Sequence, residues 1–246
     1  MSDRLGSARL LVRDDGDVVV LTFNRPERRN ALDRTAFGEL TAALRAADQN
    51  SAVGAVVLTG APPAFCAGAD LDELKTRSDD DPRALGPAFE ELLDTLVGLT
   101  VPLIAAVDGA AVGLGATLLL HCDLVVAGDQ ARLRFPFVSL GVTVEAGAGA
   151  LLPDLVGAQQ AARLLLTGCW VDADESFSLG LATVRAVEAL PTALELGQAV
   201  AAAPREAVRT TRQLLAAQRR PSVEAARAQE RAAWSRLQNR RPHDPR

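Results

Sequence analysis

The chain has 246 residues, of which 48% are hydrophobic and 23% charged, and its formal net charge is -5. These values are typical of a globular chain with a sizeable core and exclude an intrinsically disordered one. No apolar run reaches the roughly 20 residues of a membrane span, no apolar signal core follows the N-terminus, and the three cysteines lack disulfide-framework or zinc spacing. We therefore expect a cytoplasmic protein without a membrane segment or a metal site.

The first half of the chain alternates predicted strands and helices. Residues 8–12 and 17–23 are expected to form a hairpin around Asp14, Asp15 and Gly16, and Asp33 is placed to cap a helix that reaches about residue 47. Further strands are expected at 55–59, 102–107, 124–127 and 132–135, with an amphipathic helix at 82–99. This alternation predicts parallel strands packed against helices, an α/β fold.

Beyond Gly157 the sequence predicts helices only. Alanine, leucine, arginine and glutamate dominate the segments 158–166, 173–179, 192–202, 204–217 and 222–237. Prolines at 191, 204 and 221 stand at plausible first turns. We expect a mixed core over residues 1–190 and a helical, oligomer-forming region over residues 191–246.

The C-terminal region is strongly basic. Residues 204–246 hold 11 arginines and 4 acidic residues, a balance of +7. Such a region could bind nucleic acid. The dispersed helical spacing favours instead a helix face that forms ion pairs with an acidic neighbour, so no nucleic-acid partner is expected.

Two glycine-rich segments, 60–71 and 108–117, each follow a predicted strand and lead into a predicted helix. Small residues at such positions expose backbone N–H groups, and two N–H groups that converge on one oxygen form an oxyanion hole. The alternative is that the glycines only allow tight turns and close packing.

Four blocks in the chain resemble the enoyl-CoA hydratase/isomerase (crotonase) superfamily, in the family's order and spacing. They are Asn24-Arg25-Pro26-Glu27-Arg28-Arg29-Asn30-Ala31-Leu32; Phe65-Cys66-Ala67-Gly68-Ala69-Asp70-Leu71; Ala106-Val107-Asp108-Gly109 with Gly113-Leu114-Gly115 and Cys122-Asp123-Leu124; and Leu165-Leu166-Thr167-Gly168 with Ala173, Glu175 and Gly180-Leu181. Together they span about residues 18 to 184.

The resemblance implies a crotonase-like ββα spiral core with an all-helical C-terminal region, assembled as a trimer or a hexamer. It implies that the N–H groups of Ala69 and Leu114 hold the oxygen of an acyl-CoA thioester. It also implies that the CoA moiety lies near Arg28, Ala31, Ala67, Asp70 and Leu71. No cofactor beyond the CoA of the substrate is expected.

The chain departs from the family's hydratases at the two catalytic glutamates, whose positions fall on Thr117 and Phe137. Neither residue can act as a general base. Glu145 is the carboxylate that remains nearby, and one carboxylate is enough to move a proton between two carbons. We therefore expect a Δ3-Δ2 enoyl-CoA isomerase with Glu145 as proton shuttle. The alternatives are a non-catalytic acyl-CoA-binding protein and a weak, atypical hydratase; Glu145 could also cap the following helix or point to solvent.

Other residues with reactive side chains are expected to have packing roles. His121 stands among apolar residues and lacks a partner signal, and Cys66 has no histidine at nucleophile–base spacing. Four large aromatic side chains could line an acyl pocket, although aromatic residues more often belong to the core: Phe135, Phe137, Trp170 and Trp234.

Overall fold

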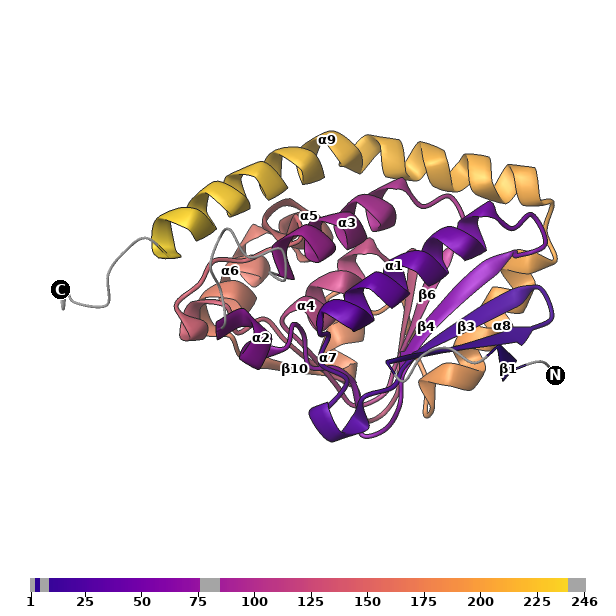
Figure 1. Cartoon of the computed structure of the whole chain (residues 1–246), viewed down its shortest axis with the longest axis horizontal. Coiled ribbons are helices and arrows are strands. Elements are labelled where there is room, and N and C mark those ends of the chain that lie inside the picture. Colours follow the sequence, from indigo (N-terminus) through magenta and orange to yellow (C-terminus); the bar gives the residue numbers. More distant parts are fainter. Residues whose placement is uncertain (1–2, 5–8, 76–84, 239–246) are drawn as a thin grey trace.

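The computed structural model describes residues 3–4, 9–75 and 85–238, which build two sheets surrounded by helices (Figure 1). The larger sheet has the spatial order β1 (Asp3–Arg4), β2 (Leu10–Asp15), β3 (Val18–Phe23), β4 (Ala55–Gly60), β6 (Leu103–Val107), β8 (Leu124–Ala127) and β11 (Val184–Arg185). The smaller sheet has the order β10 (Trp170–Asp172), β9 (Arg132–Arg134), β7 (Ala110–Val112) and β5 (Ala64–Cys66).

The chain passes between the two sheets in a repeated order. β4, β6 and β8 lie side by side and parallel in the larger sheet, and each is followed by a strand of the smaller sheet, β5, β7 or β9, which are also parallel. Helical segments come next: α2 (Leu71–Lys75) and α3 (Leu85–Gly98), then α4 (Leu114–Thr117) and η2 (Leu118–His121), then η3 (Val138–Leu140) and α5 (Ala148–Val156). This is the ββα spiral that the resemblance implies, so the predicted fold class is confirmed.

The central strands are almost wholly apolar because both faces of the larger sheet are buried. In β4, Val56 and Leu58 belong to the main core, whereas Ala55 and Val57 face a second cluster. The second cluster lies under α8 (Ala189–Ala201), and the main core lies under α1 (Arg34–Gln49) and α3. The α8 helix therefore covers one face of the larger sheet and is packed on the core.

The N-terminal hairpin and the α1 cap are where the sequence predicts them, but Asp14 and Asp15, expected in the turn, are the last residues of β2. β2 and β3 form an antiparallel hairpin whose turn is Gly16-Asp17, with Gly16 at a φ of 64°. The carboxylate of Asp33 accepts a hydrogen bond of 2.8 Å from the N–H of Ala36 and so caps α1. The helix predicted at 82–99 corresponds to α3; residues 82–84 lie outside the described residues.

The C-terminal helices are predicted correctly except at Pro221, but the expectation of helices only beyond Gly157 was wrong, because β10 and β11 also lie there. α6 (Ala158–Thr167) and α7 (Ala173–Ser178) match the expected segments, but the expected pair 204–217 and 222–237 was wrong. These residues form one helix, α9 (Arg205–Gln238), with Pro221 inside it. Figure 1 shows α9 as one long arch over the molecule. Proline in a helix interior removes one backbone hydrogen bond, and contacts on both sides of Pro221 hold the two halves in line. Among the described helices, none is both long enough and apolar enough to span a membrane.

The arginines of α9 explain how this helix is attached to the core. Seven of them bind carboxylates or carbonyl oxygens of the larger-sheet region and α3: Arg205 with Asp17, Arg209 with Asp48, Arg212 and Arg219 with Asp123, Arg220 with the Val97 carbonyl, Arg227 with Glu90 and Asp94, and Arg231 with Glu90. The expected ion pairing between a basic helix face and an acidic neighbour is thereby confirmed for all of these residues except Arg220, whose partner is a carbonyl. The basic character of α9 serves intramolecular docking.

We expect Arg212→Ala to lower the free energy of unfolding by about 3 kcal/mol, the order found when one partner of a buried ion pair is removed. The side chain of Arg212 is 5% exposed, and its Nε lies 2.6 Å from an Asp123 oxygen that also accepts the N–H of Leu103. Urea denaturation followed by circular dichroism measures the change. Arg236→Ala, on the exposed surface of the same helix, should change it by less than about 0.5 kcal/mol. Equal effects of the two substitutions would contradict this account.

Candidate active site

The segment that precedes α1 forms one side of the candidate site. Arg29 and Asn30 have φ values of 51° and 58°, and asparagine tolerates this left-handed conformation better than most residues. The Asn30 amide donates hydrogen bonds of 2.7 and 2.6 Å to the carbonyl oxygens of Ala61 and Ala64. Its Oδ1 accepts the N–H of Arg25 at 2.9 Å. Asn30 therefore joins residues 24–32 to the loop around β5.

The same segment runs beside the first glycine-rich loop and orients its backbone. A parallel bridge pairs Leu32 with Ala69: the N–H of Leu32 donates to the Gly68 carbonyl (2.8 Å), and the N–H of Asp70 donates to the Leu32 carbonyl (2.9 Å). In such a bridge the neighbours of Ala69 are bonded and the N–H of Ala69 points away from the partner segment. The Ala69 N–H is thus directed to the other side of the loop.

The second loop lies on that other side. β5 and β7 are parallel neighbours, so their carboxyl ends meet at one edge of the smaller sheet. A Cβ built on Gly68, which has a φ of 92°, would lie 2.7 Å from the Val112 carbonyl oxygen and 3.2 Å from the Leu114 nitrogen. A Cβ on Gly115 would lie 2.2 Å from the Cys66 carbonyl oxygen. The two loops are therefore in backbone contact, and this contact requires glycine.

The contact leaves two backbone donors at one edge. Leu114 begins α4, and the first N–H groups of a helix have no partner within it. Of the hydrogen bonds that tie together the described turns and loops, none is donated by the N–H of Ala69 or Leu114. Two such donors from adjacent loops have the arrangement that an oxyanion hole needs.

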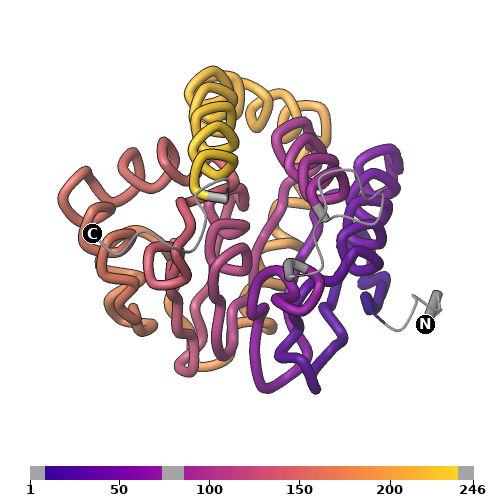
Figure 2. Tube along the Cα trace, turned by 60° about the vertical axis from the view of Figure 1, so that its left-hand side comes forward, coloured from indigo at the N-terminus to yellow at the C-terminus, as the bar shows by residue number. Residues whose placement is uncertain are grey.

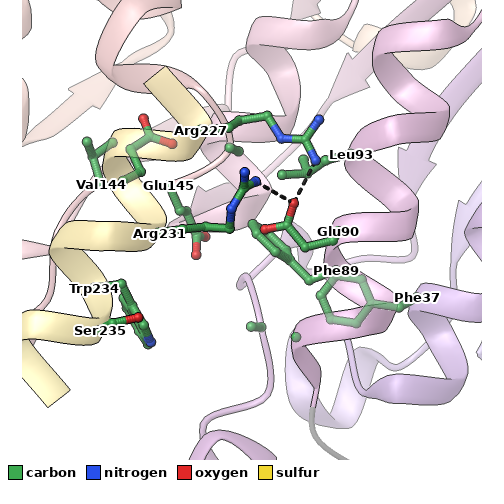
Figure 3. A pocket seen from close by; sticks show the side chains of 14 residues that line it. Phe37, Phe89, Glu90, Leu93, Val144, Glu145, Arg227, Arg231, Trp234 and Ser235 are labelled. Carbon is green, nitrogen blue, oxygen red and sulfur yellow. Dashed lines mark hydrogen bonds and ion pairs between the residues drawn. The ribbon is translucent and has the colours of Figure 1, made fainter. Parts of the chain in front are cut away.

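A cavity of about 270 Å³ lies beside Ala69, one of the two residues that carry these donors (Figure 3). Its wall includes Ala69 and Glu145, which the sequence places far apart. The apolar part of the wall comes from α1, α3, α9 and the loop before α5, through Phe37, Phe89, Leu93, Val144, Ala146 and Trp234. Its charged part consists of Glu90, Glu145, Arg227, Glu230 and Arg231. The structure thus brings the predicted base and one predicted thioester donor to one pocket, and the loop contact at Gly68 places Leu114 next to it.

Residues 117 and 137 stay outside this chemistry. Thr117 is fully buried and its hydroxyl donates to the Leu114 carbonyl at 3.3 Å. Phe137 packs in the main core, as does Phe135. Neither position supplies an acid or a base.

Glu145 lies half-buried in a strained loop between η3 and α5. Gly141, Ala146 and Gly147 have φ values of 71°, 64° and 74°. The Ala146 carbonyl accepts a hydrogen bond of 2.8 Å from His121 Nε2. Burial lowers the pKa of His121 to about 4, so the imidazole is neutral near pH 7. His121 is therefore a buried, neutral residue as the sequence predicts, and its ring also holds the loop of Glu145 through the Ala146 carbonyl.

Sequence reasoning missed most of what α9 contributes. Arg227, Glu230, Arg231 and Trp234 follow the i, i+3, i+4, i+7 spacing of one helix face, and all four line the pocket. Figure 3 shows Arg231 and Trp234 on the opposite side of the pocket from Phe37 and Phe89. The spacing could have identified a common face, but not the surface on which that face packs. Of the aromatic residues expected near a pocket, Trp234 is there, while Trp170 lies 4.9 and 5.4 Å from the guanidinium carbons of Arg132 and Arg134.

The residues expected near CoA lie together where residues 24–32 meet residues 66–72. Arg28 forms an exposed ion pair of 3.0 Å with Asp72, and Leu71 is exposed, while Ala31 and Ala67 are partly exposed. Asp70 is buried: its carboxylate contacts Arg25 at 3.1 Å and accepts the N–H of Asp72 at 3.0 Å. Burial acts to raise the pKa of Asp70, but these hydrogen bonds and the Arg25 charge hold it below its usual value. Asp70 thus has a structural role, and the CoA contacts of all five residues stay predictions.

Cysteine and metal chemistry find no support in the described residues. Burial raises the pKa of the Cys66 thiol to about 12, so it is not a thiolate near neutral pH. Within the described ranges no three His, Cys, Asp or Glu side chains are grouped as metal ligands.

We expect Gly68→Ala to weaken binding of crotonyl-CoA at least tenfold, because the added methyl group collides with the Val112 carbonyl and displaces the Ala69 N–H. Isothermal titration calorimetry measures the affinity. Gly38→Ala, on an exposed face of α1 with no atom near the new Cβ, is the matched control and should leave the affinity unchanged. An unchanged affinity in Gly68→Ala would contradict the role of this loop contact.

Comparisons with known proteins agree with this geometry. The family model described as enoyl-CoA hydratase/isomerase matches residues 13–243. A Mycobacterium tuberculosis (strain H37Rv) protein named probable enoyl-CoA hydratase EchA14 is 41% identical over 204 residues, covering 81% of this chain and 78% of that protein. The 2,3-dehydroadipyl-CoA hydratase of Escherichia coli (strain K12) is 34% identical over 94% of this chain and 90% of its own length.

Solved structures give the same result. The crystal structure of an enoyl-CoA hydratase/isomerase from Pseudoalteromonas atlantica superposes with a TM-score of 0.88 at 32% identity, covering 94% of this chain and 92% of that one. The shared sequence blocks, the ββα spiral and the paired loops at Gly68 all lead to one assignment. The chain is an enzyme of the enoyl-CoA hydratase/isomerase family.

Proposed function

We propose that this protein is a Δ3-Δ2 enoyl-CoA isomerase in which Glu145 carries the proton. The observation that supports the proposal is the shared pocket of Glu145 and Ala69, combined with Thr117 and Phe137 at the two positions that hold glutamates in the family's hydratases. Hydration needs a water molecule held between two acid–base groups. A 1,3-proton shift needs only one acid–base group.

In the proposed reaction the thioester oxygen of a 3-enoyl-CoA accepts hydrogen bonds from the N–H groups of Ala69 and Leu114. The Glu145 carboxylate removes a proton from C2, and the resulting dienolate carries its charge on the thioester oxygen and C4. The two N–H donors stabilise that charge. Glu145 then returns the proton to C4, and the double bond lies between C2 and C3. The proposed reaction uses no cofactor beyond the CoA of the substrate. The residues that would contact this CoA are Arg28, Ala31, Ala67, Asp70 and Leu71.

A second candidate reaction is hydration of a 2-enoyl-CoA with Glu145 as the base. The names of relatives favour it, since the E. coli relative and a short-chain-enoyl-CoA hydratase of Clostridium acetobutylicum, 34% identical, are both hydratases by name. An ultraviolet assay separates the two reactions. Isomerisation of 3-hexenoyl-CoA raises the absorbance of the conjugated enoyl thioester, and hydration of crotonyl-CoA lowers it. Binding of both esters without any turnover would contradict both reactions.

We expect Glu145→Gln to lower kcat for 3-hexenoyl-CoA by about 100- to 10,000-fold, the range over which general acid–base groups contribute. The dissociation constant of the ester should change less than threefold, because the amide keeps the size of the side chain. Stopped-flow absorbance and calorimetry give the two values. Glu206→Gln, an exposed position on α9, is the control. Turnover at the wild-type rate in Glu145→Gln would exclude the proposed role.

We also propose that the protein forms a trimer or a hexamer through the surface of η3, α5, α6, β10 and α7. Several large apolar side chains are exposed there: Val138, Leu140, Leu155, Leu166, Trp170 and Phe177. α6 packs against both α5 and η3, and α7 packs against β10, so these elements are neighbours in pairs. Clustered exposed apolar residues mark association surfaces.

We expect Leu166→Glu, at a side chain that is 68% exposed, to shift the protein from the oligomer to the monomer in size-exclusion chromatography with light scattering. A charge in an apolar interface loses its hydration without gaining a partner. Val187→Glu, at an exposed valine outside this surface, should leave the oligomer intact. A monomeric wild-type protein would refute the proposal.

A further inference from the structure

We propose that Glu230 of α9 is a positioning residue that holds the backbone of the Glu145 loop in its working conformation. The inference rests on the proposed role of Glu145 and adds the residue through which α9 acts on it. The observation behind it is a direct connection: both carboxylate oxygens of Glu230 bind the turn that follows Glu145.

The contacts are short and use the whole carboxylate. Glu230 Oε2 accepts the N–H of Gly147 at 2.7 Å, and Oε1 accepts the N–H of Gly149 at 2.9 Å. Gly147 is the N-cap of α5 and has no side chain with which to satisfy these donors. The partial positive charge at the helix N-terminus favours a carboxylate in this place. Glu230 thus supplies, from 81 and 83 residues away, the cap that α5 cannot make locally.

The turn needs such an external support because its conformation is unfavourable. Ala146 has a φ of 64°, and an alanine in the left-handed region costs roughly 1–2 kcal/mol. The structure holds this residue from two sides. His121 binds its carbonyl oxygen at 2.8 Å, and Glu230 binds the N–H of the next residue. Glu145 directly precedes Ala146, so the direction of the Glu145 side chain depends on these two anchors.

The contact between Glu230 and the turn is also closely packed. A Cβ on Gly149 would lie 3.1 Å from Glu230 Oε1, and a Cβ on Gly147 would lie 2.9 Å from a methyl carbon of Val223, one residue of α9. Glu230 is 8% exposed. Burial raises the pKa of Glu230 against the effect of the two N–H donors. The glutamate is therefore enclosed by the turn and by its own helix.

α9 itself is held to the opposite wall of the pocket. Arg227, one turn before Glu230, binds Asp94 at 2.8 Å. Arg227 and Arg231 also bind Glu90, at 2.7 and 3.0 Å (Figure 3). These ion pairs place α9 between α3 and α5, as the tube view also shows (Figure 2). One face of α9 therefore joins the apolar wall of the pocket to the turn that carries Glu145.

A carboxylate is required because two N–H groups must each meet an oxygen. Glutamine offers one oxygen and turns an NH2 group toward the other donor. We expect Glu230→Gln to lower kcat for 3-hexenoyl-CoA about 10- to 100-fold while KM changes less than threefold, because a small misplacement of a catalytic group affects the chemical step. The exchange of the C2 protons of butyryl-CoA with deuterium oxide, followed by NMR, should slow by a similar factor. A role in stability alone would lower the melting temperature and leave both rates of the folded protein unchanged.

Three further variants complete the experiment. Glu224→Gln, on the exposed surface of the same helix, is the matched control and should keep wild-type rates. Glu230→Asp keeps the charge but is one methylene shorter, so its rates should lie between those of Glu230→Gln and the wild type; it also serves if Glu230→Gln does not fold. Glu145→Gln should lower turnover by the 100- to 10,000-fold given above and slow the exchange by a similar factor.

The outcomes separate the two proposals. Wild-type rates in Glu230→Gln or Glu230→Asp, with Glu145→Gln slowed as expected, would overturn the positioning role alone. Wild-type rates in Glu145→Gln would overturn the proposed function and, with it, the role of Glu230. A wild-type protein that shows neither isomerisation nor C2-proton exchange would likewise overturn both.

Discussion

The backbone contact between the loops after β5 and β7 is the constraint on which the candidate active site depends. Gly68 and Gly115 lie so close to carbonyl oxygens of the opposite segment that a Cβ at either position would collide with one of them. The parallel pairing of β5 and β7 brings the loops to one edge, and the bridge between Leu32 and Ala69 turns the Ala69 N–H toward that edge. Two weak local features, a glycine loop and a helix start, become one polar site because the sheet aligns them.

The pocket beside these donors is completed by the last helix of the chain. Without α9, the apolar side chains of α1 and α3 would border solvent instead of Trp234 and Arg231. The attachment of α9 is largely electrostatic, through arginines that meet carboxylates distributed from Asp17 to Asp123. Arginine suits this function because its planar guanidinium binds two acceptors at once and stays charged when partly buried. Carboxylates of the acidic remainder of the chain and the basic C-terminal region thus meet in one interaction.

The buried carboxylate of Glu230 and the positive-φ backbone of the Glu145 loop lie on the same side of the pocket. Ala146 and Gly147 have positive φ values, and Glu230 and His121 hold them from opposite sides. Strained backbone persists only where surrounding contacts determine it fully, and such places are frequent at functional sites. The loop of Glu145 has this character, which distinguishes it from an ordinary surface connection.

The sequence by itself determined an α/β core, since apolar runs of strand length and the Asp33 cap are local signals that the structure reproduces. Its ββα spiral was implied by the resemblance of the four sequence blocks to the family. The sequence also shows that the two positions matching the hydratases' glutamates hold Thr117 and Phe137, once the family's blocks are matched along the chain. Only the tertiary structure decided that residues 205–238 form one helix through Pro221, and that Glu230 binds Gly147 and Gly149. These features depend on contacts between residues more than 80 positions apart. Local propensity says which residues share a helix face, but the packing of the whole chain decides what that face touches.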